Sequence, residues 1–257
     1  MRIADFNSGR PAMSATAVER MSKNSLNKKS TEREVSSLNS YYDRLTQAGA
    51  PFELVREDVL GESMLVLANR PKSLAEILVA SEQYDDREFL ISGDQRITFR
   101  EHRDLVSRFA HALQKKYGVG QGDRVAILGA NSVEWIVAFW ATTSLGAIAV
   151  GLNGWWSSRE IVDGLADCQP KLIVGDRKRL ARIANESISI PIIEIETDFD
   201  AVTASEDEVE ARPISEDDPA CILYTSGTTG RAKGAILSHR ALIASVGLQS
   251  LNGAAML

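Results

Sequence analysis

Cysteine and histidine are scarce in this sequence of 257 residues. The two cysteines, Cys168 and Cys221, are too few for a disulfide framework, and neither has a histidine or a second cysteine nearby. We therefore interpret both as reduced structural thiols of a cytoplasmic protein, with a catalytic thiol as the alternative. The three histidines have no spacing from which a catalytic triad can be argued, and we interpret each as structural.

A long uninterrupted hydrophobic run is also missing. Residues 135–152 carry no charged side chain, but hydroxyl residues and glycines interrupt the run before about 20 apolar residues accumulate. We interpret it as a buried helix followed by a buried strand rather than as a transmembrane segment. Residues 1–40 are rich in Ser, Lys, Asn and Arg and lack a hydrophobic centre, which excludes a secretory signal and predicts a disordered tail.

Basic residues are nearly absent from one segment. Residues 194–218 contain eleven acidic side chains and a single basic one, Arg212, in a chain of net charge -6. We expect this segment to be a solvated connecting loop. Its acids are scattered without the spacing of metal ligands, so no metal site is assigned to them. No nucleic-acid partner is expected.

The remaining sequence indicates an α/β fold. Residues 41–70 allow no confident assignment and are treated as an N-terminal extension, whereas from Pro71 onward apolar strands alternate with helices that begin at capping residues. This alternation predicts a parallel sheet with helices on both faces. The expected strands are 89–92, 96–98, 124–128, 147–152, 171–174 and 192–195, and the expected helices begin at Ser73, Thr98, Asn131 or Ser132, Ser157, Asp176 and Ser238.

The most informative segment is residues 224–233, Tyr-Thr-Ser-Gly-Thr-Thr-Gly-Arg-Ala-Lys, which lies between two apolar runs. Its glycines let backbone N–H groups turn inward over an anion, its hydroxyls add donors, and the lysine adds positive charge. The segment therefore predicts a phosphate-binding loop. A Walker loop is excluded, because two residues separate Gly230 from Lys233 and a glycine follows the lysine. An ordinary hairpin loop is the alternative, but such loops need only about two to five residues.

This motif resembles the phosphate loop of the adenylate-forming (AMP-binding) superfamily, which comprises acyl-CoA synthetases, luciferases and the adenylation domains of peptide synthetases. The segments 97–102, 122–127, 131–135 and 145–147 resemble the same superfamily, so the resemblance covers residues 71–257. Ala232 and Gly151 replace prolines that are usual there. We expect a looser backbone at both positions but no loss of a ligand-contacting group.

The resemblance implies a reaction and a set of site residues. It implies ATP-dependent activation of a small-molecule carboxylate to an acyl-adenylate, with Mg²⁺, followed by transfer to coenzyme A. It implies that Thr228 and Lys233 are catalytic. The residues expected to hold or shape the ATP-phosphate site are Thr225, Ser226, Gly227, Thr228, Thr229, Gly230 and Lys233.

The substrate and the extent of the enzyme are less constrained. The pair Leu152-Asn153 and the continuation 234–240 resemble acyl-CoA synthetases, which favours a fatty acid; an amino-acid adenylation fragment and a non-catalytic nucleotide-binding or interaction module are the alternatives. The resemblance is to an N-terminal portion only. We therefore expect 71–257 to be a partial AMP-binding domain whose missing C-terminal half and lid domain would act as partner, so that the chain alone is not competent.

Overall fold

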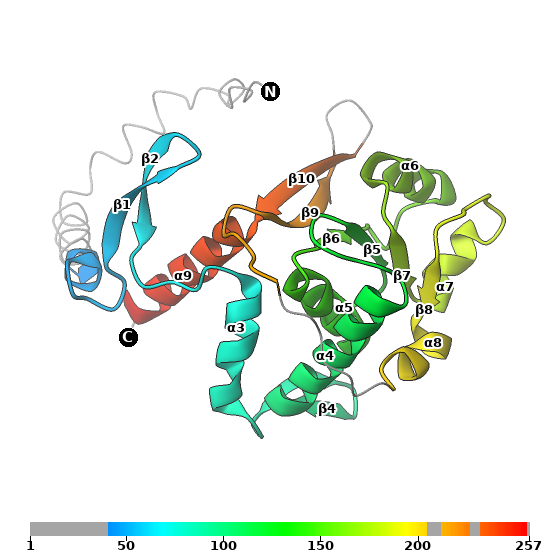
Figure 1. Ribbon diagram of the computed structural model, residues 1–257, viewed down its shortest axis with the longest axis horizontal. Helices are drawn as coiled ribbons and strands as arrows, with labels where there is room; N and C mark the ends of the chain where they lie inside the picture. The colour runs from blue at the N-terminus through cyan, green and yellow to red at the C-terminus, as the bar shows by residue number, and fades with distance from the viewer. Residues whose placement is uncertain (1–40, 205–211, 227–231, 256–257) are drawn as a thin grey trace, which may run out of the picture. The chain divides into compact units, whose positions relative to one another are not determined.

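The computed structural model describes residues 41–204, 212–226 and 232–255 (Figure 1). The chain divides into two compact units, Met1–Asn69 with Gln249–Leu257, and Arg70–Leu248. The disordered tail predicted for residues 1–40 lies outside the described residues.

The larger unit is built on a six-stranded sheet with the strand order β10-β9-β6-β5-β7-β8. All neighbouring strands are parallel except β10, which is antiparallel to β9. The predicted parallel α/β sheet is therefore confirmed, with one antiparallel edge. The strands are β5 (Arg124–Leu128), β6 (Ile148–Gly151), β7 (Leu172–Gly175), β8 (Ile192–Glu194), β9 (Pro219–Thr225) and β10 (Lys233–Ser238).

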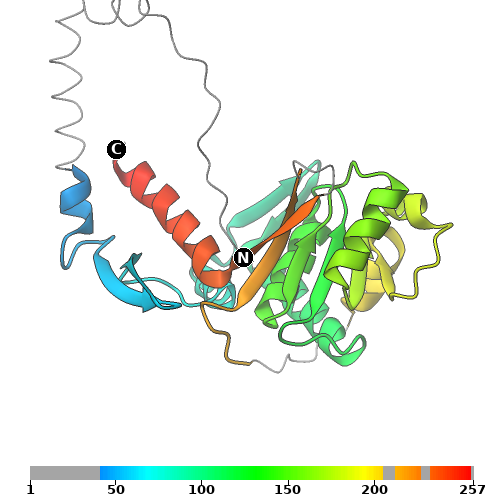
Figure 2. The same ribbon diagram turned by 90° about the horizontal axis from the view of Figure 1, so that it is seen from above.

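Helices cover both faces of this sheet, as Figure 2 shows. Val125 and Ile127 of β5 pack toward one face, in a core with α4 (Phe99–Lys115), α5 (Val133–Ser144) and α8 (Ile195–Val202). Ala126 and Leu128 pack toward the other, with α6 (Ser158–Cys168) and α7 (Arg177–Leu180). Because successive residues of a strand point to opposite faces, a strand covered on both sides must be apolar throughout.

The helices begin at the residues that the sequence predicted. Thr98 and Ser157 each form a complete capping box, with Glu101 and Glu160 respectively. Ser132, rather than Asn131, caps α5, and Asp176 caps α7. Short elements precede α4 in this unit: α3 (Leu74–Ala80), a 3-10 turn (Ser81–Tyr84), and the antiparallel pair of β3 (Glu88–Ser92) and β4 (Gln95–Thr98). The last helix, α9 (His239–Ala255), starts as predicted after Ser238 and runs further than expected.

The expectation of a solvated loop over residues 194–218 is wrong at both of its ends. Residues Ile195–Val202 form α8, which buries Phe199 and Val202. At the other end, Glu216 and Asp217 are held in ion pairs with basic residues from elsewhere in the chain. The local sequence contains almost no opposing charge, so these partners could not be seen in it.

The smaller unit contains structure that the sequence left unassigned. Residues 41–46 are helical, and β1 (Leu54–Val59) pairs with β2 (Glu62–Leu67) in an antiparallel hairpin. Leu60 and Gly61 both have positive φ, 54° and 90°, as the tight two-residue turn between right-twisted strands requires. The hydroxyl of Tyr41 donates to the carbonyl of Ala254 at 3.1 Å.

The apolar run of residues 135–152 forms most of α5 and then β6, as the sequence predicted. Within the parts of the chain that the structure describes, no helix has the length and apolar character needed to cross a membrane.

Candidate functional site

The predicted phosphate loop connects β9 to β10. Because β9 is parallel to β6, it ends at the same edge of the sheet as β5, β6 and β7. Thr225, the last residue of β9, lies directly opposite Lys233, the first residue of β10, and its hydroxyl donates to the Lys233 carbonyl at 3.4 Å. Ser226 follows and is exposed, like Thr225 and Lys233. Of the predicted site residues, Gly227, Thr228, Thr229 and Gly230 lie outside the described residues.

The position of the loop suits a ligand site. In open α/β sheets, ligands bind outside the carboxyl ends of the parallel strands, and Thr225 and Ser226 emerge at this edge. The Ser226 hydroxyl and the Lys233 ammonium group are exposed there and can donate hydrogen bonds to an anion, whereas the Thr225 hydroxyl already donates to the Lys233 carbonyl. The described part of the loop therefore has the chemistry of a phosphate site.

Tyr224 anchors the strand that leads into the loop, a contact that the sequence did not predict. Its hydroxyl lies 2.7 Å from Oδ2 of Asp167 and 3.2 Å from the carbonyl of Gly164, both on α6. Its ring meets Trp156 edge to face, with the centroids 5.1 Å apart. Burial and the hydrogen bond to Asp167 both raise the pKa of Tyr224, so the hydroxyl stays protonated and acts as a donor.

Two glycines allow close packing beside the loop. A Cβ at Gly164 would lie 2.7 Å from the Trp156 ring, and a Cβ at Gly234 would lie 2.8 Å from Cγ2 of Ile222. Neither distance is tolerated between carbon atoms, so any larger residue would push its neighbour away. Gly234 was recognised in the sequence only as the residue that follows the lysine of the motif. The structure shows that it also allows close packing between β9 and β10.

A cavity of about 330 Å³ lies between α6 and the loop. Tyr224 and Ala232 line it on one side, and the carboxylates of Glu160, Asp163 and Asp167 line it on the other. Three carboxylates repel an anion rather than bind it. The groups that could hold phosphate therefore belong to the loop itself and not to α6.

A second cavity, of about 530 Å³, lies at the same edge beyond β5 and β7. Asp176 organises its floor: the carboxylate accepts from the backbone N–H groups of Ala130 and Arg179, each at 2.8 Å. Burial alone would raise the pKa of Asp176, but these hydrogen bonds and the Arg179 guanidinium lower it. Asp176 is therefore a charged structural group that joins the ends of two strands.

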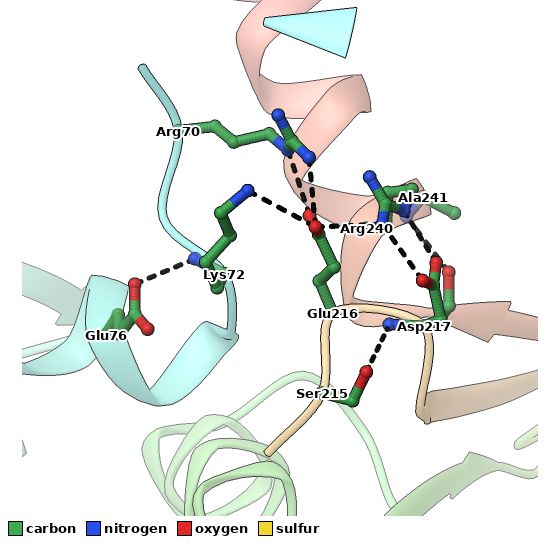
Figure 3. A network of polar contacts seen from close by, with 9 residues as sticks. Arg70, Lys72, Glu76, Ser215, Glu216, Asp217, Arg240 and Ala241 are labelled. Carbon is green, nitrogen blue, oxygen red and sulfur yellow. Dashed lines mark hydrogen bonds and ion pairs between the residues drawn. The ribbon is translucent and has the colours of Figure 1, made fainter. Parts of the chain in front are cut away.

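A network of ion pairs closes the other end of the β9–β10 pair (Figure 3). The Arg240 guanidinium forms two hydrogen bonds with Asp217, at 2.6 and 2.9 Å, and contacts Glu216 at 2.8 Å. Glu216 also accepts two hydrogen bonds from Arg70, both at 2.9 Å, and one from Lys72 at 3.2 Å. Burial opposes the charge of Glu216, but its basic partners lower its pKa, and the Arg240 hydrogen bond lowers that of Asp217.

Two of the three histidines, His102 and His239, and both cysteines are buried in the structure. Nδ1 of the buried His239 accepts a hydrogen bond from the Leu74 backbone at 3.1 Å, and burial lowers the pKa of this imidazole. His102 is 1% exposed and packs against Phe89. Cys168 and Cys221 are free and buried, and burial raises the pKa of the Cys168 thiol to about 11.

The fold and the loop together define a class of protein: an open, mostly parallel α/β sheet that presents a glycine- and hydroxyl-rich loop ending in lysine at its carboxyl edge. The chain belongs to the AMP-binding enzyme family, whose match covers residues 78–255. The prediction of an N-terminal portion of an AMP-binding domain is thereby confirmed.

Curated relatives and solved structures agree with this assignment. The chain is 32% identical over 181 residues to 4-coumarate–CoA ligase CCL1 of Humulus lupulus, covering 65% of this chain and 33% of that protein. It is 29% identical over 191 residues to medium/long-chain-fatty-acid–CoA ligase FadD6 of Mycobacterium tuberculosis, covering 69% and 31%. Its structure matches anthranilate CoA ligase AuaEII, solved with anthranoyl-AMP, at a TM-score of 0.61 and 26% identity, covering 65% and 34%. The chain spans about a third of the length of the curated relatives that it matches.

Proposed function

We propose that this chain supplies the ATP-phosphate site of an enzyme that activates a carboxylic acid as its acyl-adenylate and transfers the acyl group to coenzyme A. The observation that carries the proposal is the exposed Thr225, Ser226 and Lys233 at the carboxyl edge of the sheet of an AMP-binding enzyme. The acid–CoA ligases among its relatives support the same reaction class.

The chemistry requires charge to be absorbed. A carboxylate oxygen attacks the α-phosphorus of ATP, a new P–O bond forms, and the bond to the β-phosphate oxygen breaks to release pyrophosphate. The thiol sulfur then bonds to the acyl carbon as AMP departs, and the thiol proton is released. An anion must approach a polyanion in the first step, so preorganised donors have the largest effect there.

Each of the predicted site residues has a proposed role. Lys233 and the hydroxyls of Ser226, Thr228 and Thr229 donate to the β- and γ-phosphates and stabilise the charge that builds on the leaving pyrophosphate. Thr225, Gly227 and Gly230 shape the backbone around them. The hydrogen-bond donors described at this edge fit the oxygens of a polyphosphate. A Mg²⁺ ion bound with ATP would add positive charge to the same oxygens.

The nature of the acid is a finer proposal. We favour a fatty acid, on the Leu152-Asn153 landmark and on the resemblance to a medium/long-chain-fatty-acid–CoA ligase. An aromatic acid is the second candidate, because ligases named for 4-coumarate and for hydroxybenzoates also match.

The proposal is tested first by binding. Pyrophosphate and MgATP titrated into the purified chain should bind in the wild type, and Lys233→Ala should weaken binding by about 10-fold or more, the scale of losing one strong donor. Lys116→Ala is the matched control, because Lys116 is an exposed lysine at the end of α4 that lies against the Tyr117 ring and does not belong to the predicted site. Equal binding by Lys233→Ala and wild type would refute the assignment.

Carboxylate-dependent ATP–pyrophosphate exchange then tests the reaction. Fatty acids of increasing length, 4-coumarate, hydroxybenzoate and amino acids are supplied in turn. Exchange with a fatty acid supports the favoured substrate class, and exchange with an aromatic or amino acid replaces it. Binding of MgATP without exchange with any acid would show that this chain binds the nucleotide but does not activate a carboxylate alone, as expected if the rest of the enzyme is required.

A further inference from the structure

Burial and turn geometry constrain the register of β10 on β9 only weakly. Burial of one face normally fixes strand register, but residues 233–236 of β10 are all exposed, Ile236 by 65%. A tight turn also fixes register, but the connection between β9 and β10 is seven residues long, 226–232. The core contacts β10 only near its end, where Leu237 packs against it, and neither burial of residues 233–236 nor a tight turn holds Lys233 opposite Thr225.

The ladder is irregular where β10 ends. Leu237 pairs with Cys221 and Ser238 with Pro219, so Ala220 is an extra residue that bulges from β9. A shift of one residue would turn every side chain of β10 to the other face, including Lys233. The ammonium group that is proposed to contact the phosphates would then point away from them.

The ion pairs at the closed end of this strand pair oppose such a shift. Arg240 follows β10 by two residues, while Glu216 and Asp217 precede β9 by three and two. The guanidinium holds both carboxylates, and the Arg240 backbone N–H donates to the Glu216 carbonyl at 2.6 Å. Glu216 is itself fixed by Arg70, whose side chain is 4% exposed. A planar guanidinium that makes two parallel hydrogen bonds to a carboxylate is fixed in orientation as well as attracted to it.

We propose that Arg240, through Asp217 and Glu216, sets the register of β10 on β9 and so places Lys233 opposite Thr225. Arg240 is a positioning residue at the far end of the strand pair, and it does not touch the ligand. The consequence for phosphate binding rests on the proposed function, whereas the register itself does not.

Disulfide trapping measures the register directly. Leu223 and Ala235 are cross-strand partners, so the pair Leu223→Cys with Ala235→Cys reports the observed register. The pair Leu223→Cys with Ile236→Cys reports a register shifted by one residue, because in the observed register these two side chains point to opposite faces of the sheet and their Cβ atoms cannot be bridged. The native Cys168 and Cys221 stay out of the reaction because burial raises the pKa of both thiols.

Arg240→Gln is expected to lower the ratio of in-register to shifted product by about 10-fold, the effect of losing a hydrogen bond between charged groups. Lys72→Gln is the matched control. It removes one positive charge from the same Glu216, but Lys72 lies far from β10 in the sequence whereas Arg240 follows that strand by two residues, so the ratio should stay at the wild-type value. An unchanged ratio in Arg240→Gln would overturn the proposal and leave the packing of Gly234 under Ile222 as the determinant of register.

Two further measurements separate the possible failures. If Arg240→Gln loses its near-ultraviolet circular dichroism, Asp217→Asn replaces it, since this variant keeps the contacts of Arg240 and Arg70 with Glu216. The same shift in product ratio is expected. An unchanged ratio in a folded Asp217→Asn protein would refute the proposed role of the contact between Arg240 and Asp217. Pyrophosphate affinity should fall about 10-fold in Arg240→Gln and not in Lys72→Gln. Absence of pyrophosphate binding by the wild type refutes the proposed function while the trapping result stands.

Discussion

Strands β5 and β10 belong to one sheet and are held in it by different forces. Val125 to Leu128 of β5 have no exposed surface and pack against helices on both faces. Residues 233–236 of β10 are exposed, and that strand is held by its hydrogen bonds to β9, by one glycine contact and by ion pairs at its end. The sheet therefore has an interior fixed by apolar burial and an edge fixed by polar contacts, and the candidate site lies at the edge.

Truncation of one isoleucine in each strand is the strongest test of this difference between β5 and β10. Ile127→Ala in β5 leaves a cavity in a closed core and should lower the free energy of unfolding by about 2–5 kcal/mol. Ile236→Ala in β10 removes an exposed side chain and should change it by less than about 0.5 kcal/mol. Urea denaturation of both variants provides the measurement. Similar losses in the two would show that β10 is buried in solution.

Acid should destabilise the interior through His102. Burial, with the neighbouring Arg103 charge, lowers the pKa of His102 to about 4 from its ordinary value of 6.5. As the pH falls, the unfolded chain takes up the proton first, so the contribution is complete above about pH 6.5 and is lost toward pH 4. The expected loss between pH 7 and pH 5 is on the order of 2 kcal/mol.

The matching variant is His102→Gln, which cannot titrate in this range. Its free energy of unfolding should be lower at pH 7, because the site is buried among aromatic rings, yet it should fall less between pH 7 and pH 5 than that of the wild type. Identical slopes in the two proteins would mean that His102 is not neutral and buried in solution.

A smaller effect than those of Ile127→Ala and of His102 is expected from the hydroxyl of Tyr224 on β9. Tyr224→Phe removes the hydroxyl that contacts Asp167 and Gly164 but keeps the ring against Trp156. The loss should be about 1 kcal/mol, because the exposed Asp167 carboxylate returns to water. Denaturant unfolding measures it, with Tyr84→Phe as a control whose ring also packs on an aromatic neighbour. A loss above about 3 kcal/mol would show that this contact stabilises the protein as strongly as the buried residues of the sheet interior do.

The sequence predicted best those features whose causes are local. Capping boxes at Thr98 and Ser157 need residues only three positions apart, and the apolar run of β5 reports its own burial. The partners of Glu216 and Tyr224 were not predicted, because Arg70 lies 146 residues from Glu216 and Asp167 lies 57 residues from Tyr224. The hairpin of the smaller unit was missed because its turn uses Leu60 at a positive φ, where glycine or asparagine is the usual signal.

In the candidate site, too, the features that depend on contiguous residues were predicted and those that depend on distant partners were not. The contiguous residues of the loop were sufficient to indicate the family, which the match over residues 78–255 confirms, whereas phosphate binding by the loop stays a prediction. The roles of Thr228, Thr229, Gly227 and Gly230 remain predictions, and they lie outside the described residues. Arg240 carried no signal of its own in the sequence, because its role follows from where Asp217 and Glu216 meet it.

The strand order has a consequence for synthesis. Strand β5 is the first of the six in the chain, yet it lies in the middle of the sheet, with β6 and β7 on either side of it. A nascent chain therefore carries three adjacent central strands once residue 175 has left the ribosome, while β9 begins only at Pro219. The interior can assemble from one contiguous stretch of about 50 residues before the loop that is proposed to bind phosphate has been translated.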